Sequence, residues 1–517
     1  MGYPIMTNVN KVALNSLALY ANMGVTMLAT LLGTRFVLQA LGKEEFGIYA
    51  LIASLVALFS FLNIAMAAAT QRYLSFSIGE GEEGQLREIF YGSVLIHWGI
   101  AAVVGLILLT GGYYAVTNVL DIAPSLSGGA QVVLLCVTAG LVMTINAVPY
   151  EATMNAHEDM VAVAMVNIVE AILKLGASIA VLWLTSYRLE CYAFFILCAQ
   201  TFAFLAKRFY SRSHYVEVHF TIHRPENSAL LRNMLSFAGW NLIGTGCNMA
   251  RYQGTAVLLN LFFGLVVNAA YGVAQQVNGF LVFFAGSVVR PLRPQLIKSE
   301  GAGQHERMLE LAFTTSRVTF LMMAIVVIPL YINMPYVLGL WLPAVPEGTV
   351  AFCRGFLLIV LINQATVGLN LALESVGRIR LVQMVCGTLH CVALPVGYAL
   401  FRLGFPAVSI MYCIVVEELV CIVLRIWVTQ RDAMVPQLRC YRDMLLPEVL
   451  LFALSFVPVW LLSTQMESGP AQLLLTSALG LLLLAACSLI FYLSDWEKAK
   501  LHALLAGVWK RVGRKHS

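Results

Sequence analysis

The chain has 517 residues, of which 60% are apolar and 11% are charged, with a mean hydropathy of +0.81. A soluble globular protein carries about 25% charged residues, so this composition excludes a soluble fold. The small basic excess, 32 Lys and Arg against 27 Asp and Glu, lies in short clusters between apolar runs and argues against a nucleic-acid partner.

Apolar runs separated by charged residues, Gly or Pro predict about fourteen membrane-spanning helices, because one span needs about 20 apolar residues. These runs start near residues 12, 46, 89, 129, 160, 188, 230, 265, 308, 349, 379, 405, 446 and 470. The predicted fold class is an all-α polytopic membrane protein. The N-terminus has no basic segment of the signal-peptide type, so no signal peptide is expected.

The distribution of Lys and Arg predicts the orientation, because cytoplasmic loops hold an excess of both. If the N-terminus is cytoplasmic, the basic stretch 207–232 and the basic tail 495–517 also lie inside. The opposite connections contain little beyond Lys43, Arg188 and Arg402. We therefore expect both termini on the cytoplasmic side.

The long polar stretch after the sixth span divides the first twelve spans into six and six. This division predicts an N-lobe of spans 1–6 and a C-lobe of spans 7–12, followed by two further spans. The predicted segments are the N-lobe at 1–210, a cytoplasmic linker at 211–228, the C-lobe at 229–430, spans 13 and 14 at 431–494, and the basic tail at 495–517.

Two pairs of segments indicate an internal repeat. INAVPYEATMNAHE (145–158) resembles INQATVGLNLALE (362–374), and LGKEEFGIYA (41–50) faintly resembles FGLVVNAAYGVA (263–274). The two offsets agree within a few residues, although the identities are few enough that chance similarity is the alternative. Transporters are commonly built from such repeats, with the substrate path between the halves.

Polar side chains form stripes on one face of several predicted spans. The first span has Asn22 and Thr26, and the seventh and eighth have longer stripes. Such faces avoid lipid, so we expect these three spans to line one water-accessible cavity; hydrogen bonding between helices is the alternative. The stripes of the seventh and eighth spans contain Asn248, Arg251, Tyr252, Tyr271, Gln275 and Asn278.

Arg251 lies deep in the seventh span, where a lone cation costs about 2.5 to 3.5 kcal/mol. Either an anionic substrate or a buried carboxylate must offset this cost. No acidic residue shares its helical arc, which favours the anionic substrate.

Glu170 and Lys174 lie four residues apart on the fifth span and can pair with each other. Transport against a gradient needs a carboxylate that binds H⁺ or Na⁺, and we take Glu170 and Glu374 as the coupling candidates. The other acidic residues in or near spans are Glu151, Glu158, Glu417 and Glu418.

The sequence contains no P-loop, HExxH motif or nucleophile elbow, so we expect no catalytic residues and no enzyme activity. The eleven cysteines fall singly, without zinc spacing, and are interpreted as small apolar fillers. His97 and His390 are interpreted as packing residues. No metal and no cofactor are expected.

Four segments carry a family resemblance: residues 41–76, SFAGWNL (236–242), LLNLFFGLVVNAAYGVAQQVNGF (258–280) and RPQLIKS (293–299). They resemble the polysaccharide-transporter branch of the multidrug/oligosaccharidyl-lipid/polysaccharide exporter superfamily, which includes O-antigen and capsule repeat-unit flippases. The resemblance implies two six-helix lobes in a V around a central cavity, plus two C-terminal helices.

The same resemblance implies a function in the bacterial inner membrane. The substrate would be an oligosaccharide on undecaprenyl diphosphate, moved from the inner to the outer leaflet by alternating access. Membrane lipid, a polysaccharide polymerase and glycosyltransferases would be its neighbours. The chain departs from the family pattern at Tyr271, where an Arg is frequent, and at Arg293, where an Asn is usual. The first departure places more of any diphosphate contact on Arg251.

The predicted substrate-binding residues are Arg251, Asn22, Thr26, Asn248, Tyr252, Tyr271, Gln275, Asn278 and Lys174. Two other functions compete with the flippase. An ion-coupled small-molecule antiporter of the multidrug type should have an acidic, aromatic cavity, whereas the deepest unpaired charge here is predicted to be Arg251. A membrane-embedded polysaccharide polymerase or ligase should have a large outer loop, whereas the outer connections here are short.

Overall fold

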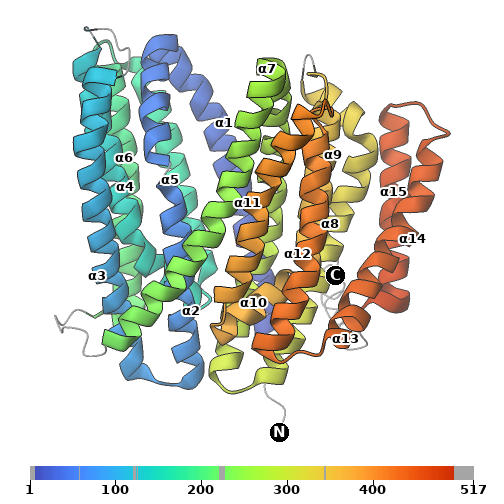
Figure 1. Cartoon of the computed structure of the whole chain (residues 1–517). Coiled ribbons are helices and arrows are strands. Elements are labelled where there is room, and N and C mark those ends of the chain that lie inside the picture. Colours follow the sequence, from blue (N-terminus) through green and yellow to red (C-terminus); the bar gives the residue numbers. More distant parts are fainter. Residues whose placement is uncertain are drawn as a thin grey trace, which may run out of the picture. The chain divides into compact units, whose positions relative to one another are not determined.

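The computed structural model describes residues 6–57, 59–119, 124, 126–219, 228–342 and 345–493, and all regular elements in these ranges are helical (Figure 1). The predicted tail 495–517 and residues 220–227 of the predicted linker lie outside the described residues. The predicted all-helical polytopic fold is confirmed for the part of the chain that is described.

The first half of the chain forms six long helices, with a short 3₁₀ turn at Val216–Val218 after the last of them. They are α1 (Met6–Ala57), α2 (Ser60–Glu80), α3 (Glu83–Ile107), α4 (Ser127–Ala156), α5 (Met160–Ala180) and α6 (Arg188–His214).

The second half contains one very long helix, α7, followed by shorter ones. They are α7 (Ser228–Gly301), α8 (His305–Trp341), α9 (Thr349–Ala365), α10 (Val367–Val376), α11 (Arg380–Arg402), α12 (Ser409–Ala433), α13 (Gln437–Cys440), α14 (Leu446–Ser463) and α15 (Pro470–Cys487).

Ten helical segments among the described residues are long and apolar enough to cross a membrane, and α9 with α10, bent by 46°, would form an eleventh span. The remaining predicted spans correspond to helical segments that are more polar. In α12, for example, Glu417, Glu418 and Arg425 interrupt the apolar run. The chain is a multi-pass membrane protein.

The helices pack into two compact units, which are described separately. Unit 1 comprises residues 1–246 and 290–308, and unit 2 comprises residues 247–289 and 309–517. The predicted lobe boundaries at 210 and 229 stay a prediction.

In unit 1, α4 packs against α2, α3 and α6, while α1 packs along α5. One apolar core of the described residues joins α1, α4 and α6 and includes Ile52, Val133 and Leu189. In unit 2, α12 packs against α9, α10 and α11, and α14 packs against α15. Phe352, Phe356 and Ile414 are fully buried there, so α9 and α12 form the centre of this unit.

Two glycines interrupt otherwise continuous helices. Gly42 in α1 has φ 73° and ψ −176°, and Gly264 in α7 has φ 78° and ψ −170°. Only glycine adopts this region without strain, because it has no Cβ. The two glycines lie 222 residues apart, the offset of the weaker predicted sequence repeat. The same backbone break therefore occurs at equivalent positions in the two halves, which supports the repeat.

The stronger sequence repeat also has a structural counterpart. Asn146 in α4 donates its side-chain amide to the carbonyl of Val142 (2.8 Å), and its equivalent Asn363 in α9 donates to Ile359 (3.1 Å). Pro149 lies inside α4 at the position equivalent to Thr366, where α9 ends and α10 begins. A proline inside one helix and a break between two helices thus occupy the same repeat position.

We expect Gly42→Ala and Gly264→Ala each to lower the free energy of unfolding by about 1 to 3 kcal/mol, because an L residue is strained at these dihedral angles. Thermal unfolding of the purified protein in detergent measures this loss. Gly272→Ala is the matched control, since Gly272 lies in α7 with helical geometry and open space around its Cβ position. Equal stability of the control and the two variants would contradict the expectation.

Candidate functional site

Arg251 of α7 is the centre of a buried polar cluster in unit 2. Its side chain is 1% exposed, and its Nη1 donates to Oε1 of Glu418 at 2.8 Å and to Oε1 of Glu417 at 3.0 Å. Both carboxylates come from α12 and are also buried. The buried carboxylate, which the sequence left open as the alternative, is therefore present, and contact of Arg251 with an anionic substrate stays a prediction.

The second terminal nitrogen of the Arg251 guanidinium, Nη2, contacts its own helix. Nη2 donates to Oδ1 of Asn248 at 2.9 Å and reaches the hydroxyl of Tyr252 at 3.4 Å. The guanidinium carbon lies 5.0 Å from the centre of the Tyr252 ring, within cation–π range. Asn248 and Tyr252 thus hold the orientation in which Arg251 faces α12.

Two more side chains complete this cluster. His390 of α11 is hydrogen-bonded through Nδ1 to Glu417, and Arg425 of α12 donates to Thr366 while its charge acts on Glu418. We call Arg251, His390, Glu417, Glu418 and Arg425 the Arg251 cluster. Two guanidinium charges balance two carboxylate charges, which is how such groups are tolerated inside a membrane protein.

The sequence missed these partners of Arg251 because they lie 166 and 167 residues further along the chain, on another helix. The available signal was the adjacent Glu417 and Glu418 inside an apolar run. His390, predicted to be a packing residue with satisfied hydrogen bonds, is hydrogen-bonded to Glu417.

Tyr271 and Gln275, in the second part of α7, meet the cluster at Tyr252. The Tyr271 hydroxyl and the Gln275 amide each donate to the Tyr252 carbonyl at 3.4 Å. Tyr271 is buried, with its ring 5.6 Å from the ring of Phe352. The Asn278 side-chain oxygen is buried without a hydrogen bond. Five predicted residues are therefore brought together: Arg251, Asn248, Tyr252, Tyr271 and Gln275.

The predicted residues of the first span lie in unit 1. Asn22 is buried and accepts a hydrogen bond from the hydroxyl of exposed Thr26 at 3.2 Å. Since Asn22 and Thr26 belong to one unit and the Arg251 cluster to the other, the predicted common cavity stays a prediction.

The remaining predicted residues lie in separate places. Lys174 and Glu170 of α5 form the expected ion pair at 2.7 Å, and both are partly exposed. Glu374 is buried in α10. The roles of Glu170 and Glu374 in ion coupling stay predictions.

A second polar cluster, in unit 1, surrounds Glu158 at the end of α4. Its carboxylate accepts hydrogen bonds from Lys298 Nζ at 2.8 Å and from Gln295 Nε2 at 3.2 Å. Its backbone carbonyl accepts one from Asn15 Nδ2 at 2.8 Å. Glu158 therefore joins the ends of α1, α4 and α7.

Next to Glu158, His157 is paired with Glu217 in the turn after α6, at 2.6 Å. Burial disfavours the ionised Glu217, but the hydrogen bond from His157 and the nearby charge of Arg87 hold the pKa of Glu217 below its usual value. A carboxyl whose folded-state pKa is depressed stabilises the fold above its unfolded pKa, and the contribution is lost as the pH falls. The pair thus stabilises unit 1 at neutral pH.

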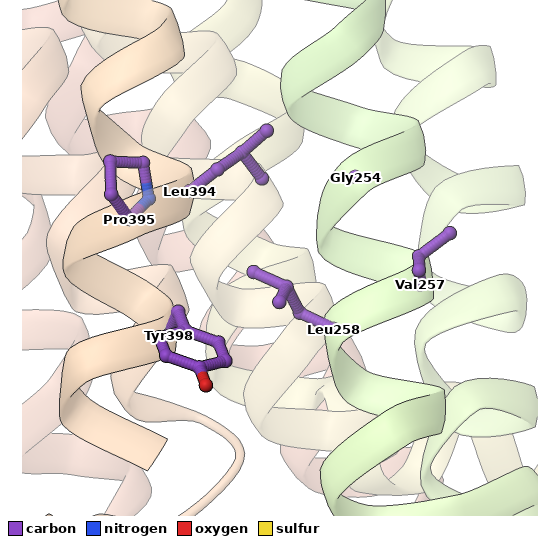
Figure 2. Close-up of a pocket in the computed structure, with 6 residues that line it drawn as sticks. All are labelled: Gly254, Val257, Leu258, Leu394, Pro395 and Tyr398. Carbon is purple, nitrogen blue, oxygen red and sulfur yellow. The ribbon is translucent and has the colours of Figure 1, made fainter. Parts of the chain in front are cut away.

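Each unit contains a cavity among its described residues. An apolar groove of about 390 Å³ lies between α7 and α11 (Figure 2). A polar pocket of about 220 Å³ is lined in part by Glu158, Gln295 and Lys298. Neither is lined by Arg251. The six residues of the groove are Gly254, Val257, Leu258, Leu394, Pro395 and Tyr398.

No protein-family model and no curated protein matches the chain. Solved structures match over most of its length. A MATE structure in the bent conformation is similar with a TM-score of 0.73 and 12% identity, covering 82% of this chain and 95% of that one. An outward-facing multidrug resistance MATE family transporter of the MOP superfamily has a TM-score of 0.69 and 11% identity, covering 82% and 96%.

A third similar structure is a MOP superfamily transporter from Pyrococcus furiosus, described as having a binding pocket of reverse polarity that suggests a different function. Its TM-score is 0.69 at 11% identity, covering 82% of this chain and 95% of that one. At such low identity the likeness shows the fold alone. The chain has the fold of these transporters, with a buried ion cluster in unit 2.

Proposed function

We propose that this chain is a flippase that moves an undecaprenyl-diphosphate-linked oligosaccharide from the inner to the outer leaflet of a bacterial inner membrane, with both termini in the cytoplasm. The observation that carries the proposal is Arg251, a guanidinium buried in α7 of a chain with a transporter-like fold. Charged groups inside membrane proteins mark substrate or ion paths. The sequence resemblance to O-antigen and capsule flippases supports the choice of substrate.

In this proposal, the carboxylates of α12 compete with the substrate for Arg251. Both Nη1 contacts of Arg251 go to Glu417 and Glu418. Protonation of one carboxylate would weaken its hydrogen bond with Arg251. A guanidinium N–H would then be free to donate to a diphosphate oxygen. A planar guanidinium suits this ligand, because it binds two oxygens in parallel. Proton uptake and anion binding would thus be linked, with no chemical reaction on the substrate.

The test is transport by the purified full chain in liposomes that contain a fluorescent undecaprenyl-diphosphate oligosaccharide in both leaflets. An impermeant periodate reagent oxidises only the outer glycans. With the protein present, we expect the glycans of the inner leaflet to become accessible to periodate within minutes. In protein-free liposomes these inner glycans should stay protected. Protection that is unchanged by the protein would refute the flippase.

The alternative is an ion-coupled multidrug-type antiporter. It is favoured by the two buried carboxylates that contact the single guanidinium of Arg251, and by the multidrug resistance MATE transporter of similar fold. The same liposomes, loaded with a fluorescent organic cation and given a pH gradient, distinguish the two. Cation movement that depends on the gradient, without glycan movement, would select the antiporter.

A further inference from the structure

Two neighbouring helices of unit 2 each carry a pair of metal-ligating side chains with the same spacing. Cys386 and His390 lie four residues apart on α11, and Glu417 and Cys421 lie four residues apart on α12. Residues four apart lie on the same face of a helix. Since α11 packs against α12, each pair can face the other.

The side chains of three of these residues meet, and the fourth adjoins one of them. One ligand atom each of His390, Glu417 and Cys421 lies within 4.8 Å of the others. Cys386 lies one turn before His390 on α11 and interacts with Cys421, and both cysteines are free. In a tetrahedral zinc site with bonds of about 2.0 to 2.3 Å, neighbouring ligand atoms lie about 3.3 to 3.8 Å apart. His390, Glu417 and Cys421 are already close to that separation, and Cys386 adjoins Cys421.

A second observation points to a ligand at this place. Oε2 of Glu417 is buried and has no hydrogen-bond partner, although Oε1 of the same carboxylate contacts both Arg251 and His390. A buried polar atom without a partner is unfavourable, so an atom or ion that binds Oε2 would stabilise the fold. His390 is the most exposed of the four, at 13%, and gives a route of entry.

We propose that Cys386, His390, Glu417 and Cys421 form a binding site for a soft divalent metal ion of the zinc class. The donor set of two sulfurs, one nitrogen and one oxygen is typical of Zn²⁺ rather than of Mg²⁺ or Ca²⁺. Each bound ion displaces one proton from each thiol. No oxidation or reduction takes part.

The surrounding charges permit this binding. The guanidinium groups of Arg251 and Arg425 already balance the carboxylates of Glu417 and Glu418. A divalent ion that arrives with the loss of two thiol protons leaves the net charge of the site unchanged. Arg251 also contacts Glu418 at 2.8 Å, so it would still have a carboxylate partner if Glu417 turned toward the ion.

The test uses the purified full chain in detergent with a reducing agent, titrated with Co²⁺ as a spectroscopic probe of zinc sites. We expect one equivalent to bind with a strong sulfur-to-cobalt absorption in the near ultraviolet, to release about two protons, and to be displaced by Zn²⁺. Absence of this absorption in the wild-type protein would overturn the proposal.

Cys421→Ser and His390→Ala should each weaken Co²⁺ binding by at least about 100-fold, since loss of an outer partner alone costs about 10- to 100-fold. Cys440→Ser is the matched control, because Cys440 is a buried cysteine of α13 outside this site, and it should bind as the wild type does. Gel filtration confirms that each variant is folded. Wild-type binding by folded Cys421→Ser would refute the site. The result does not depend on whether the chain transports glycans.

Discussion

Arg251→Ala is expected to lower the free energy of unfolding by about 3 to 5 kcal/mol and to reduce sharply the amount of folded protein in the membrane. The substitution leaves two adjacent carboxylates without their guanidinium, and Glu417 and Glu418 are only 5% and 2% exposed. Membrane abundance and thermal unfolding in detergent measure the effect. The sequence alone is compatible with normal abundance if Arg251 is unpaired and with reduced abundance if it is paired; the two carboxylates select the second outcome.

The charge explanation can be separated from loss of packing. The triple variant Arg251→Ala, Glu417→Gln, Glu418→Gln removes the stranded charges and should recover a large part of the lost stability. Arg431→Ala is the control on α12, because the Arg431 side chain is exposed and its contact with Asp432 is 3.9 Å long. Abundance and stability of Arg251→Ala at the wild-type level would show that the cluster does not hold the fold.

The second large effect is expected at Gly79 of α2. A Cβ added there would overlap the backbone carbonyl of Lys298 in α7, and one added at Gly301 would overlap the carbonyl of Phe76. These backbones cannot rotate away as a side chain can. Gly79→Val should therefore lower the free energy of unfolding by about 3 kcal/mol or more, the upper end for overpacking, because α2 and the end of α7 must separate.

Gly99→Val in α3 provides the comparison for Gly79→Val. Gly99 lies inside a helix with nothing within 4 Å of its Cβ position, so this variant carries the same change in helix propensity without the overlap. Size-exclusion chromatography of detergent extracts and thermal unfolding distinguish the two proteins. If Gly79→Val were as stable as Gly99→Val, α2 and the end of α7 would not be packed as closely as the structure shows.

Much of the fold could be predicted from the sequence because each span is recorded in a continuous apolar run. The predicted starts near 129, 160 and 188 agree closely with α4, α5 and α6. The breaks within and between helices were harder to predict. Gly42 and Gly264 look like ordinary loop glycines, yet the helix resumes directly after each, and nothing in the predicted tenth span indicates the break at Thr366.

The candidate site could be predicted only where one helix contains both partners. Helical spacing was enough for the Glu170–Lys174 pair, which is present. The contact of Arg251 with α12, and of His390 with Glu417, depends on how separate helices are aligned against each other. A single sequence does not show how separate helices are aligned. The polar face of a predicted helix therefore identifies residues that avoid lipid, but it does not identify their partners on other helices.

The helix breaks at Gly42 and Gly264 also restrict where residues can be inserted into or deleted from the chain. A loop absorbs an inserted residue by bulging outward, but each of these breaks contains a single non-helical residue. One residue added beside Gly264 would turn the following helix by about 100°. Tyr271 and Gln275 would then point away from the Tyr252 carbonyl that they share. Insertions and deletions beside Gly42 and Gly264 would therefore misalign the helix that follows. Loops do not impose this restriction.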